Sequence, residues 1–339
     1  MSSARHSPCP LCGNASTAIV YPALKEKEEN TAAYAPSASG REQGAIVRCL
    51  RCSVVYKDPF PPEKTLKEGY EESIDEQYLA LLPERRATFA HELRFIERYK
   101  QGGRLLDVGC AEGTLLTLAR EHGWHVTGVE PNKHFIRWAK KNYHLSILQG
   151  SVFNKKLKKN SFDVITLLDV IEHVSDPRRF LWRCHELLAP GGMLFISTPD
   201  IGSIIARLMR RRWFYILSIH VFYFTQQTLG RLLSQVSFQE VESCRYLLRT
   251  RLSYVAEKSR NYLGVFGTVF HTVVWMLGLG DKEVTYWLGQ RMFVAKKPTI
   301  EDFEKPQSPL SNRFENPRRT SKLEGYSKLS IRKNTRFFK

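Results

Sequence analysis

The sequence predicts an α/β fold in which a doubly wound, largely parallel sheet carries helices on both faces. Short apolar runs of strand length at residues 104–108, 125–130 and 162–168 alternate with segments whose apolar residues have helical spacing. A turn of small residues follows the first run, and the second run ends on the acid Glu130. In such a sheet the ligand crevice lies at the carboxyl ends of the strands, and it is bordered by a tight glycine turn that joins a strand to a helix.

The composition fits a globular protein with a strongly basic surface. The chain has 339 residues, of which 42% are hydrophobic, so it has room for one large domain or for a domain with an appendage. The first ten residues contain no apolar run, which disfavours a signal peptide. The net charge of +17 suggests an anionic partner, either a nucleic acid, an anionic membrane surface or a phosphorylated substrate. The simpler explanation is a solvated basic surface with a basic tail.

Four cysteines within the first 60 residues have the spacing of a zinc ribbon. Cys9 and Cys12 form one Cys-x-x-Cys pair, and Cys49 and Cys52 form a second. Two such pairs supply four thiolates in tetrahedral geometry, and a complete protein ligand set makes the zinc structural. The odd total of seven cysteines suits a reducing, cytoplasmic location better than a disulfide scaffold. We expect the polar spacer over residues 22–44 to be a mobile loop.

Residues 61–103 are predicted to link this ribbon to the main domain. A proline-rich connector ends at Pro62, and Tyr70 and Tyr78 follow it as either lid residues or packing residues. Apolar residues at helical spacing then predict a helix from Pro83 to Tyr99, which should pack beside the first strand of the main sheet.

The turn after the first strand allows two interpretations. A dinucleotide site needs Gly-x-Gly-x-x-Gly, but only Gly109 fits, because Ala111 and Thr114 occupy the other glycine positions. The sequence Asp107-Val-Gly-Cys-Ala-Glu-Gly113 instead resembles motif I of the class I S-adenosylmethionine (SAM) methyltransferases, Asp-x-Gly-x-Gly-x-Gly. Alanine departs from that motif and disfavours a positive φ at residue 111. Glu130, about 20 residues after the turn, is placed to accept hydrogen bonds from both ribose hydroxyls.

The remaining elements follow in order along the chain. Asp176 is expected to cap a helix that has Pro177 at its first position, and Thr225 is expected to cap a helix that runs to Val236. Besides the strands at 104–108, 125–130 and 162–168, strands are predicted at residues 145–148, 193–197, 240–248 and 291–296.

A longer stretch, from about residue 104 to residue 238, resembles the ubiquinone-methyltransferase-like branch of the class I family. The resemblance rests on Asp169-Val-Ile-Glu-His-Val174, on Leu187-Leu-Ala-Pro-Gly-Gly192 and on Ser197-Thr-Pro199. With a four-cysteine ribbon ahead of it, the domain looks like bacterial methyltransferases encoded among polysaccharide or lipid-linked sugar genes. The resemblance implies a Rossmann-like sheet of seven strands within residues 104–298, the last of them antiparallel.

The same resemblance implies SAM as the methyl donor. In the family, residues just past the third strand usually contact the adenine, and Ser151 lies near that place. The implied cofactor-binding residues are Asp107, Gly109, Cys110, Ala111, Gly113, Glu130, Pro131, Ser151, Val152 and Asp169.

Two histidines are candidates for catalysis. A hydroxyl acceptor must lose its proton, and histidine suits that role near neutral pH. His173, after the fourth strand, is the preferred base or acceptor-orienting group, and His220 is the second choice, although either could be a structural histidine. We therefore expect O-methylation of a saccharide or a lipid-linked small molecule, such as a lipid-linked glycan.

Two other functions stay open. The ribbon and the net charge could instead serve an RNA methyltransferase, but the sequence has no base-stacking motif and no Asn-Pro-Pro-Tyr-like motif after the fourth strand. The second alternative is a non-catalytic binding protein built from a zinc ribbon and a Rossmann domain. Contact with nucleic acid is thus disfavoured, and peripheral contact with an anionic membrane is left open.

Cap insertions are expected at about residues 200–224 and 250–288. The arginine-flanked aromatic run 213–224 suits a membrane interface, a cover over the substrate pocket or packing against the sheet edge. Residues 262–280 are nearly uncharged, but their glycines and central histidine favour a cap or interfacial helix over a membrane span. Residues 299–339 are predicted to be a disordered basic tail.

Overall fold

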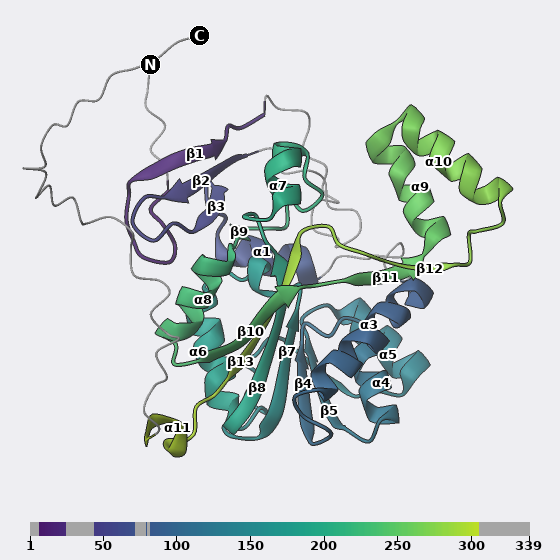
Figure 1. The fold of residues 1–339 in the computed structure, drawn as a ribbon. Helices are drawn as coiled ribbons and strands as arrows, with labels where there is room; N and C mark the ends of the chain where they lie inside the picture. The colour runs from purple at the N-terminus through teal and green to yellow at the C-terminus, as the bar shows by residue number, and fades with distance from the viewer. Residues whose placement is uncertain (1–6, 25–43, 72–78, 80–81, 305–339) are drawn as a thin grey trace, which may run out of the picture. The chain divides into compact units, whose positions relative to one another are not determined.

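The computed structural model describes residues 7–24, 44–71, 79 and 82–304 (Figure 1). It has a large unit that ends at Thr299 and a second unit that begins at Ile300, of which helix α11 (Ile300–Glu304) is described. Most of the predicted spacer loop, the candidate lid residue Tyr78 and the predicted tail beyond residue 304 lie outside the described residues.

The large unit is built on a seven-stranded sheet, which confirms the predicted fold class. Its strand order is β10-β13-β8-β7-β4-β5-β6. Strands β4 to β8 run parallel, and β13 is antiparallel to its neighbours β8 and β10. The strands are β4 (Arg104–Val108), β5 (His125–Glu130), β6 (Ile147–Gln149), β7 (Phe162–Leu168), β8 (Leu188–Pro199), β10 (Gln239–Arg245) and β13 (Gln290–Lys296). The chain moves outward from β4 in both directions, so the strand order reverses there and a crevice opens at the strand ends.

Helices cover both faces of this sheet (Figure 1). One face carries α3 (Leu82–Glu97), α4 (Thr114–Glu121) and α5 (Lys133–Tyr143), whose apolar residues share a core with strand residues such as Phe195. The other face carries α6 (Pro177–Leu187) and α8 (Gln226–Gln235), which pack on residues such as Ile165. Asp176 and Thr225 cap α6 and α8 through side-chain oxygens, as their sequence positions predict.

The cysteine-rich N-terminal region is joined to the main domain through a shared sheet. Strands β1 (Thr17–Tyr21), β2 (Ala45–Cys49) and β3 (Val55–Asp58) are antiparallel, and β9 (Phe222–Tyr223) adds to β3 from far along the chain. Apolar residues of both regions, among them Tyr56 and Phe224, belong to one core. We call this region, residues 7–58, the cysteine module.

The aromatic run 213–224 is packed inside the unit. Trp213 and Ile216 are 1% exposed, and every residue from Ile219 to Phe224 is buried. Of the three alternatives for this run, burial contradicts the membrane interface, and packing fits, because β9 places the run between the cysteine module and the sheet. A cover over the substrate pocket stays a prediction. The arginines ahead of it lie on the short helices α7 (Ile204–Met209) and η3 (Arg210–Arg212).

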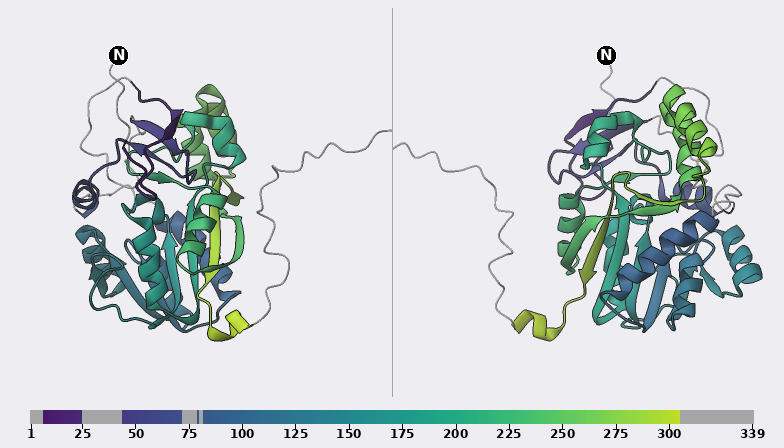
Figure 2. Two further views of the ribbon diagram at one scale, coloured as in Figure 1. Left: turned by 90° about the vertical axis from the view of Figure 1, so that its left-hand side faces the viewer. Right: turned by 45° about the vertical axis from the view of Figure 1, so that its right-hand side comes forward.

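The second insertion is a helical hairpin on a small ribbon (Figures 1 and 2). Strands β11 (Leu248–Arg251) and β12 (Glu283–Tyr286) pair with each other, and α9 (Leu252–Leu263) and α10 (Val265–Met276) lie between them in sequence. The helix predicted within 262–280 is α10, and it is shorter than the uncharged stretch because Gly264, with φ +55°, separates it from α9. The predicted strand 240–248 is divided between β10 and β11. None of the helices in the described part of the chain combines the length and the apolar character that crossing a bilayer requires.

Candidate functional site

A cavity of about 700 Å³ opens at the carboxyl ends of β4, β5, β6 and β7. Five of the predicted site residues line it: Gly109, Pro131, Ser151, Asp169 and His173. Another wall comes from helix α1 (Glu63–Glu71), which contributes Leu66 and Tyr70. The sheet therefore brings residues from four separate loops to one hollow, which is where a doubly wound fold binds its ligand.

The glycine turn between β4 and α4 has a backbone that few side chains tolerate. Gly109 has φ +71°, and a Cβ there would lie 2.7 Å from Val170 Cγ2. Ala111 adopts φ +46°, although alanine disfavours that region. Its backbone N–H donates to Glu130 Oε2 at 2.9 Å, and this bond holds the alanine in the conformation that the motif's glycine would adopt freely.

Glu130 connects this turn to the start of the next helix. Its Oε2 accepts from Ala111, and its Oε1 accepts from the N–H of Asn132 at 2.8 Å. The side chain is fully buried, and burial raises the pKa of its carboxyl to about 8 against the lowering effect of the two backbone bonds. Glu130 does not border the cavity, so its predicted contact with a ribose stays a prediction, while its contact with the turn is direct.

Other predicted cofactor residues also lie behind the cavity wall. Asp107 accepts from the Thr166 hydroxyl at 2.7 Å, and burial raises the pKa of its carboxyl to about 7. Cys110, Ala111, Gly113 and Val152 do not border the cavity either. Sequence reasoning missed Glu112, although it lies within the quoted motif: it is 1% exposed, and its Oε2 has no hydrogen-bond partner among the described residues.

His173 is the predicted catalytic histidine that lines the cavity. Its Nδ1 lies 3.0 Å from the carbonyl oxygen of Ile219. A carbonyl only accepts, so Nδ1 carries the proton and Nε2 of the neutral ring keeps its lone pair. Burial lowers the pKa of His173 to about 4, so the ring is neutral at physiological pH.

His220 lies beside His173 but does not line the cavity. Its ring centroid is 4.8 Å from that of His173, it is 4% exposed, and its Nδ1 lies 2.8 Å from Tyr215 O. Burial lowers its pKa well below the usual range. Its place favours a positioning role rather than direct contact with an acceptor.

Glu172 completes a cluster with these two histidines and was not predicted. Its Oε2 accepts from Thr198 at 3.1 Å, whereas its Oε1 has no hydrogen-bond partner within the described chain. The ligand atoms of Glu172, His173 and His220 all lie within 4.8 Å of one another. Two imidazoles and a carboxylate are a donor set that can hold a divalent metal ion.

The four cysteines of the cysteine module converge as predicted from their spacing. Cys9 Sγ is 3.6 Å from Cys52 Sγ, and Cys12 Sγ is 3.5 Å from Cys49 Sγ. Four sulfurs bound tetrahedrally at about 2.3 Å would be separated by about 3.8 Å, so these residues fit a zinc ion. The Asn14 amide and the Cys52 backbone N–H point at Cys49 Sγ, at 3.7 and 3.5 Å, and would stabilise a thiolate there.

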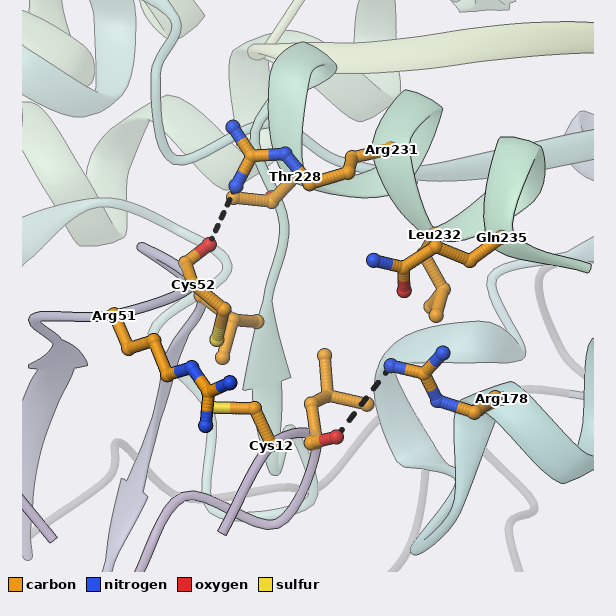
Figure 3. A pocket seen from close by; sticks show the side chains of 10 residues that line it. Cys12, Arg51, Cys52, Arg178, Thr228, Arg231, Leu232 and Gln235 are labelled. Atoms are coloured by element: carbon orange, nitrogen blue, oxygen red, sulfur yellow. Dashed lines mark hydrogen bonds between the residues drawn. The ribbon is translucent and has the colours of Figure 1, made fainter. Parts of the chain in front are cut away.

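A second cavity, of about 430 Å³, lies where the cysteine module meets α6 and α8 (Figure 3). Three arginines line it, and two of them donate to backbone carbonyls of the module. Arg231 donates to Cys52 O at 3.1 Å and Arg178 donates to Leu11 O at 3.5 Å, while Arg51 comes from the module itself. These bonds tie the module to the two helices.

Comparison with known proteins agrees with the motif and the sheet. Residues 81–243 match a family model described as a methyltransferase domain. The ubiquinone biosynthesis O-methyltransferase of Coxiella burnetii is 36% identical over 115 residues, which cover 31% of this chain and 48% of that protein. The mitochondrial ubiquinone biosynthesis O-methyltransferase of Schizosaccharomyces pombe is 36% identical over 116 residues, 32% of this chain and 42% of the relative. The match thus spans less than half of these relatives.

A solved structure of a SAM-dependent methyltransferase from Archaeoglobus fulgidus aligns with 66% of this chain and all of its own, at 20% identity and a TM-score of 0.46. The family match covers β4 to β8, the glycine turn and both catalytic candidates. Residues 81–243, a little under half of the chain, therefore resemble a methyltransferase domain, and the seven-stranded sheet has the Rossmann-like fold of that family.

Proposed function

We propose that this protein is a SAM-dependent O-methyltransferase that acts on a saccharide or a lipid-linked small molecule. The observation that carries the proposal is the place of His173, a neutral histidine on the wall of a large cavity beside the glycine turn. The relatives from Coxiella burnetii and Schizosaccharomyces pombe are O-methyltransferases, which supports oxygen as the atom that is methylated.

SAM supplies a methyl group that its sulfonium already activates, so the protein must chiefly align the acceptor and exclude water. Gly109, Pro131 and Ser151 are the cavity residues that would hold the nucleoside, and Glu130 keeps their loops in place. His173 would accept the proton of the acceptor hydroxyl at Nε2, since Ile219 O holds the proton at Nδ1.

The cavity wall supports an acceptor that has both polar and apolar parts. Leu66, Phe153 and Phe180 present apolar surface, and Arg179 lies over the Phe153 ring at 4.8 Å. This combination suits a lipid-linked molecule.

The proposal is tested by incubating the protein with methyl-labelled SAM and with separate lipid, glycan and RNA extracts. Label in a lipid or glycan product supports it. Label that enters only RNA would favour the nucleic-acid function, and absence of SAM binding by titration calorimetry would favour the non-catalytic one.

Glu130→Gln should weaken SAM binding at least about tenfold, because an amide nitrogen cannot accept and one buried backbone N–H loses its partner. Titration calorimetry measures the dissociation constant. Glu121→Gln is the matched control, since Glu121 is exposed and pairs with Arg86 on the surface. Equal affinity in the two variants would show that the turn does not depend on Glu130.

His173→Gln should lower kcat by roughly 10²- to 10⁴-fold and leave the SAM dissociation constant unchanged, because it removes the base but not the nucleoside site. His125→Gln, an exposed change at the start of β5, is the control.

The pH profile of the unmodified enzyme checks the same role. The pKa of His173 is lowered from 6.5 to about 4, so the basic form persists on acidification well past the usual histidine range. The acid limb of kcat/KM should therefore fall near that lowered pKa. An acid limb near pH 6.5 would contradict the assignment.

We also propose a structural zinc ion on Cys9, Cys12, Cys49 and Cys52. Removing it with a chelator, or by Cys49→Ser, should lower the unfolding temperature and reduce kcat roughly 10- to 100-fold, since a small misplacement of a reacting group costs that much. Strand β3 of the module pairs with β9, and the carbonyl of Ile219, just before β9, accepts the hydrogen bond that orients His173. Loss of the zinc ion should therefore displace His173. Zinc analysis and kinetics measure this, with Cys244→Ser as the control. A metal-free protein of full activity would contradict it.

A further inference from the structure

Helix α10 is apolar yet exposed. Its sequence, Val265 to Met276, contains one histidine, His271, and no Asp, Glu, Lys or Arg. Large apolar side chains are exposed along its whole length and just past its end: Val265 78%, Phe266 82%, Val269 57%, Phe270 38%, Val273 46%, Trp275 77%, Met276 71% and Leu277 63%. So large an apolar surface marks an interaction site.

Only a narrow stripe of α10 contacts its neighbour α9. Gly267 and Val274 are buried, and His271 lies between them at helical spacing, with Nε2 3.3 Å from Glu257 Oε2. A Cβ on Gly267 would lie 2.2 Å from Ser259 O, so the two helices are in close contact there. The rest of the circumference is apolar apart from Thr268 and Thr272, and none of the described residues covers it. A partner protein would cover one face of such a helix, whereas the acyl chains of a lipid layer into which the hairpin sinks can contact every side that α9 leaves free.

The polar groups on the uncovered side are satisfied within the helix. The hydroxyl of Thr268 donates to Gly264 O at 3.2 Å, and that of Thr272 donates to Thr268 O at 3.0 Å. Polar groups in hydrocarbon must find their partners internally, and these two do. The helix is too short to cross a bilayer, because twelve residues span about 18 Å against an apolar thickness of about 30 Å.

Positive charge lies at the end of the sheet where the α9–α10 hairpin also lies. Figures 1 and 2 place α7 and the α9–α10 hairpin at that end, away from the turns at the bottom of the sheet. Residues 204–224, which include α7, contain four arginines and no acid, and Leu208 on α7 is 77% exposed. Residues 249–286 contain five lysines and arginines against three acids. An anionic surface would complement this charge.

We propose that α10 lies in the interfacial layer of an anionic lipid membrane, with its axis along the surface, and anchors the protein there. This site is separate from the catalytic cavity, and the proposal does not depend on which molecule is methylated. It fits an acceptor that resides in the membrane, because the cavity opens at the carboxyl ends of the strands and the α9–α10 hairpin lies at the same end of the sheet.

The experiment is cosedimentation of the full chain with vesicles of phosphatidylcholine alone or mixed with phosphatidylglycerol. We expect binding to the mixed vesicles, and we expect Phe266→Ser combined with Val269→Ser to lower the partition coefficient roughly tenfold or more. Leu50→Ser, which removes a 63% exposed leucine from the cysteine module, is the matched control and should bind normally. SAM titration of each variant shows that it is folded.

Unchanged binding of the double variant would overturn the proposal, as would equal binding to both kinds of vesicle. Light scattering tests the alternative that a second copy of the chain covers α10. If the unmodified protein is a dimer and the double variant is a monomer, a second copy covers this helix and the membrane proposal is overturned. Quenching of Trp275 by brominated lipid, lost in Trp275→Phe, would place the helix in the bilayer directly.

Discussion

The two backbone hydrogen bonds that Glu130 accepts are the constraint on which the site depends. They join the N–H of Ala111 in the turn after β4 to the N–H of Asn132 after β5. Ala111 has a positive φ that alanine does not favour, so the turn needs this external support. Each of the two carboxyl oxygens keeps a further lone pair, so the backbone bonds leave Glu130 able to accept from another donor. These two bonds hold the turn beside the cavity in place.

The position of His173 depends in turn on the cysteine module. Strand β9 completes the module's sheet, and the residues just before it carry the carbonyl that orients His173. The N–H of Val221 donates to Glu172 O at 3.0 Å, which ties the same segment to the loop after β7. Arg178 and Arg231 add bonds across the junction. A metal in the module would therefore influence the position of His173 through packing and not through direct contact.

The sequence predicted the parts of the fold that local patterns determine. Strands β4, β5 and β7 have the predicted bounds, because each is an apolar run bordered by turn residues, and Asp176 and Thr225 cap their helices. Other strand bounds and pairings depend on contacts between residues far apart in the sequence. Strand β8 begins at Leu188, before the predicted Met193, because Leu188 already pairs with Phe162. No local pattern shows that residues 222–223 pair with β3 or that Gly264 divides a helix.

The candidate site divides in the same way. Gly109, Pro131, Ser151, Asp169 and His173 line the cavity because motif positions at strand ends are determined by the sheet. Glu112 and Glu172 lie inside the quoted motifs, yet only the structure shows that each has a buried oxygen without a partner in the described chain. The uncharged stretch 262–280 favours a cap or interfacial helix, but only the structure shows which side chains of α10 are exposed, since such a stretch is equally consistent with burial.

The central claim is that the hollow at the ends of β4 to β7 holds the methyl donor. A crystal structure of the protein with S-adenosylhomocysteine tests it most directly. The account predicts the nucleoside between Gly109, Pro131 and Ser151, with Glu130 still bonded to Ala111 and the homocysteine sulfur facing the side of the cavity that His173 lines. A nucleoside bound elsewhere, or a turn that abandons Glu130 when the ligand is present, would contradict it.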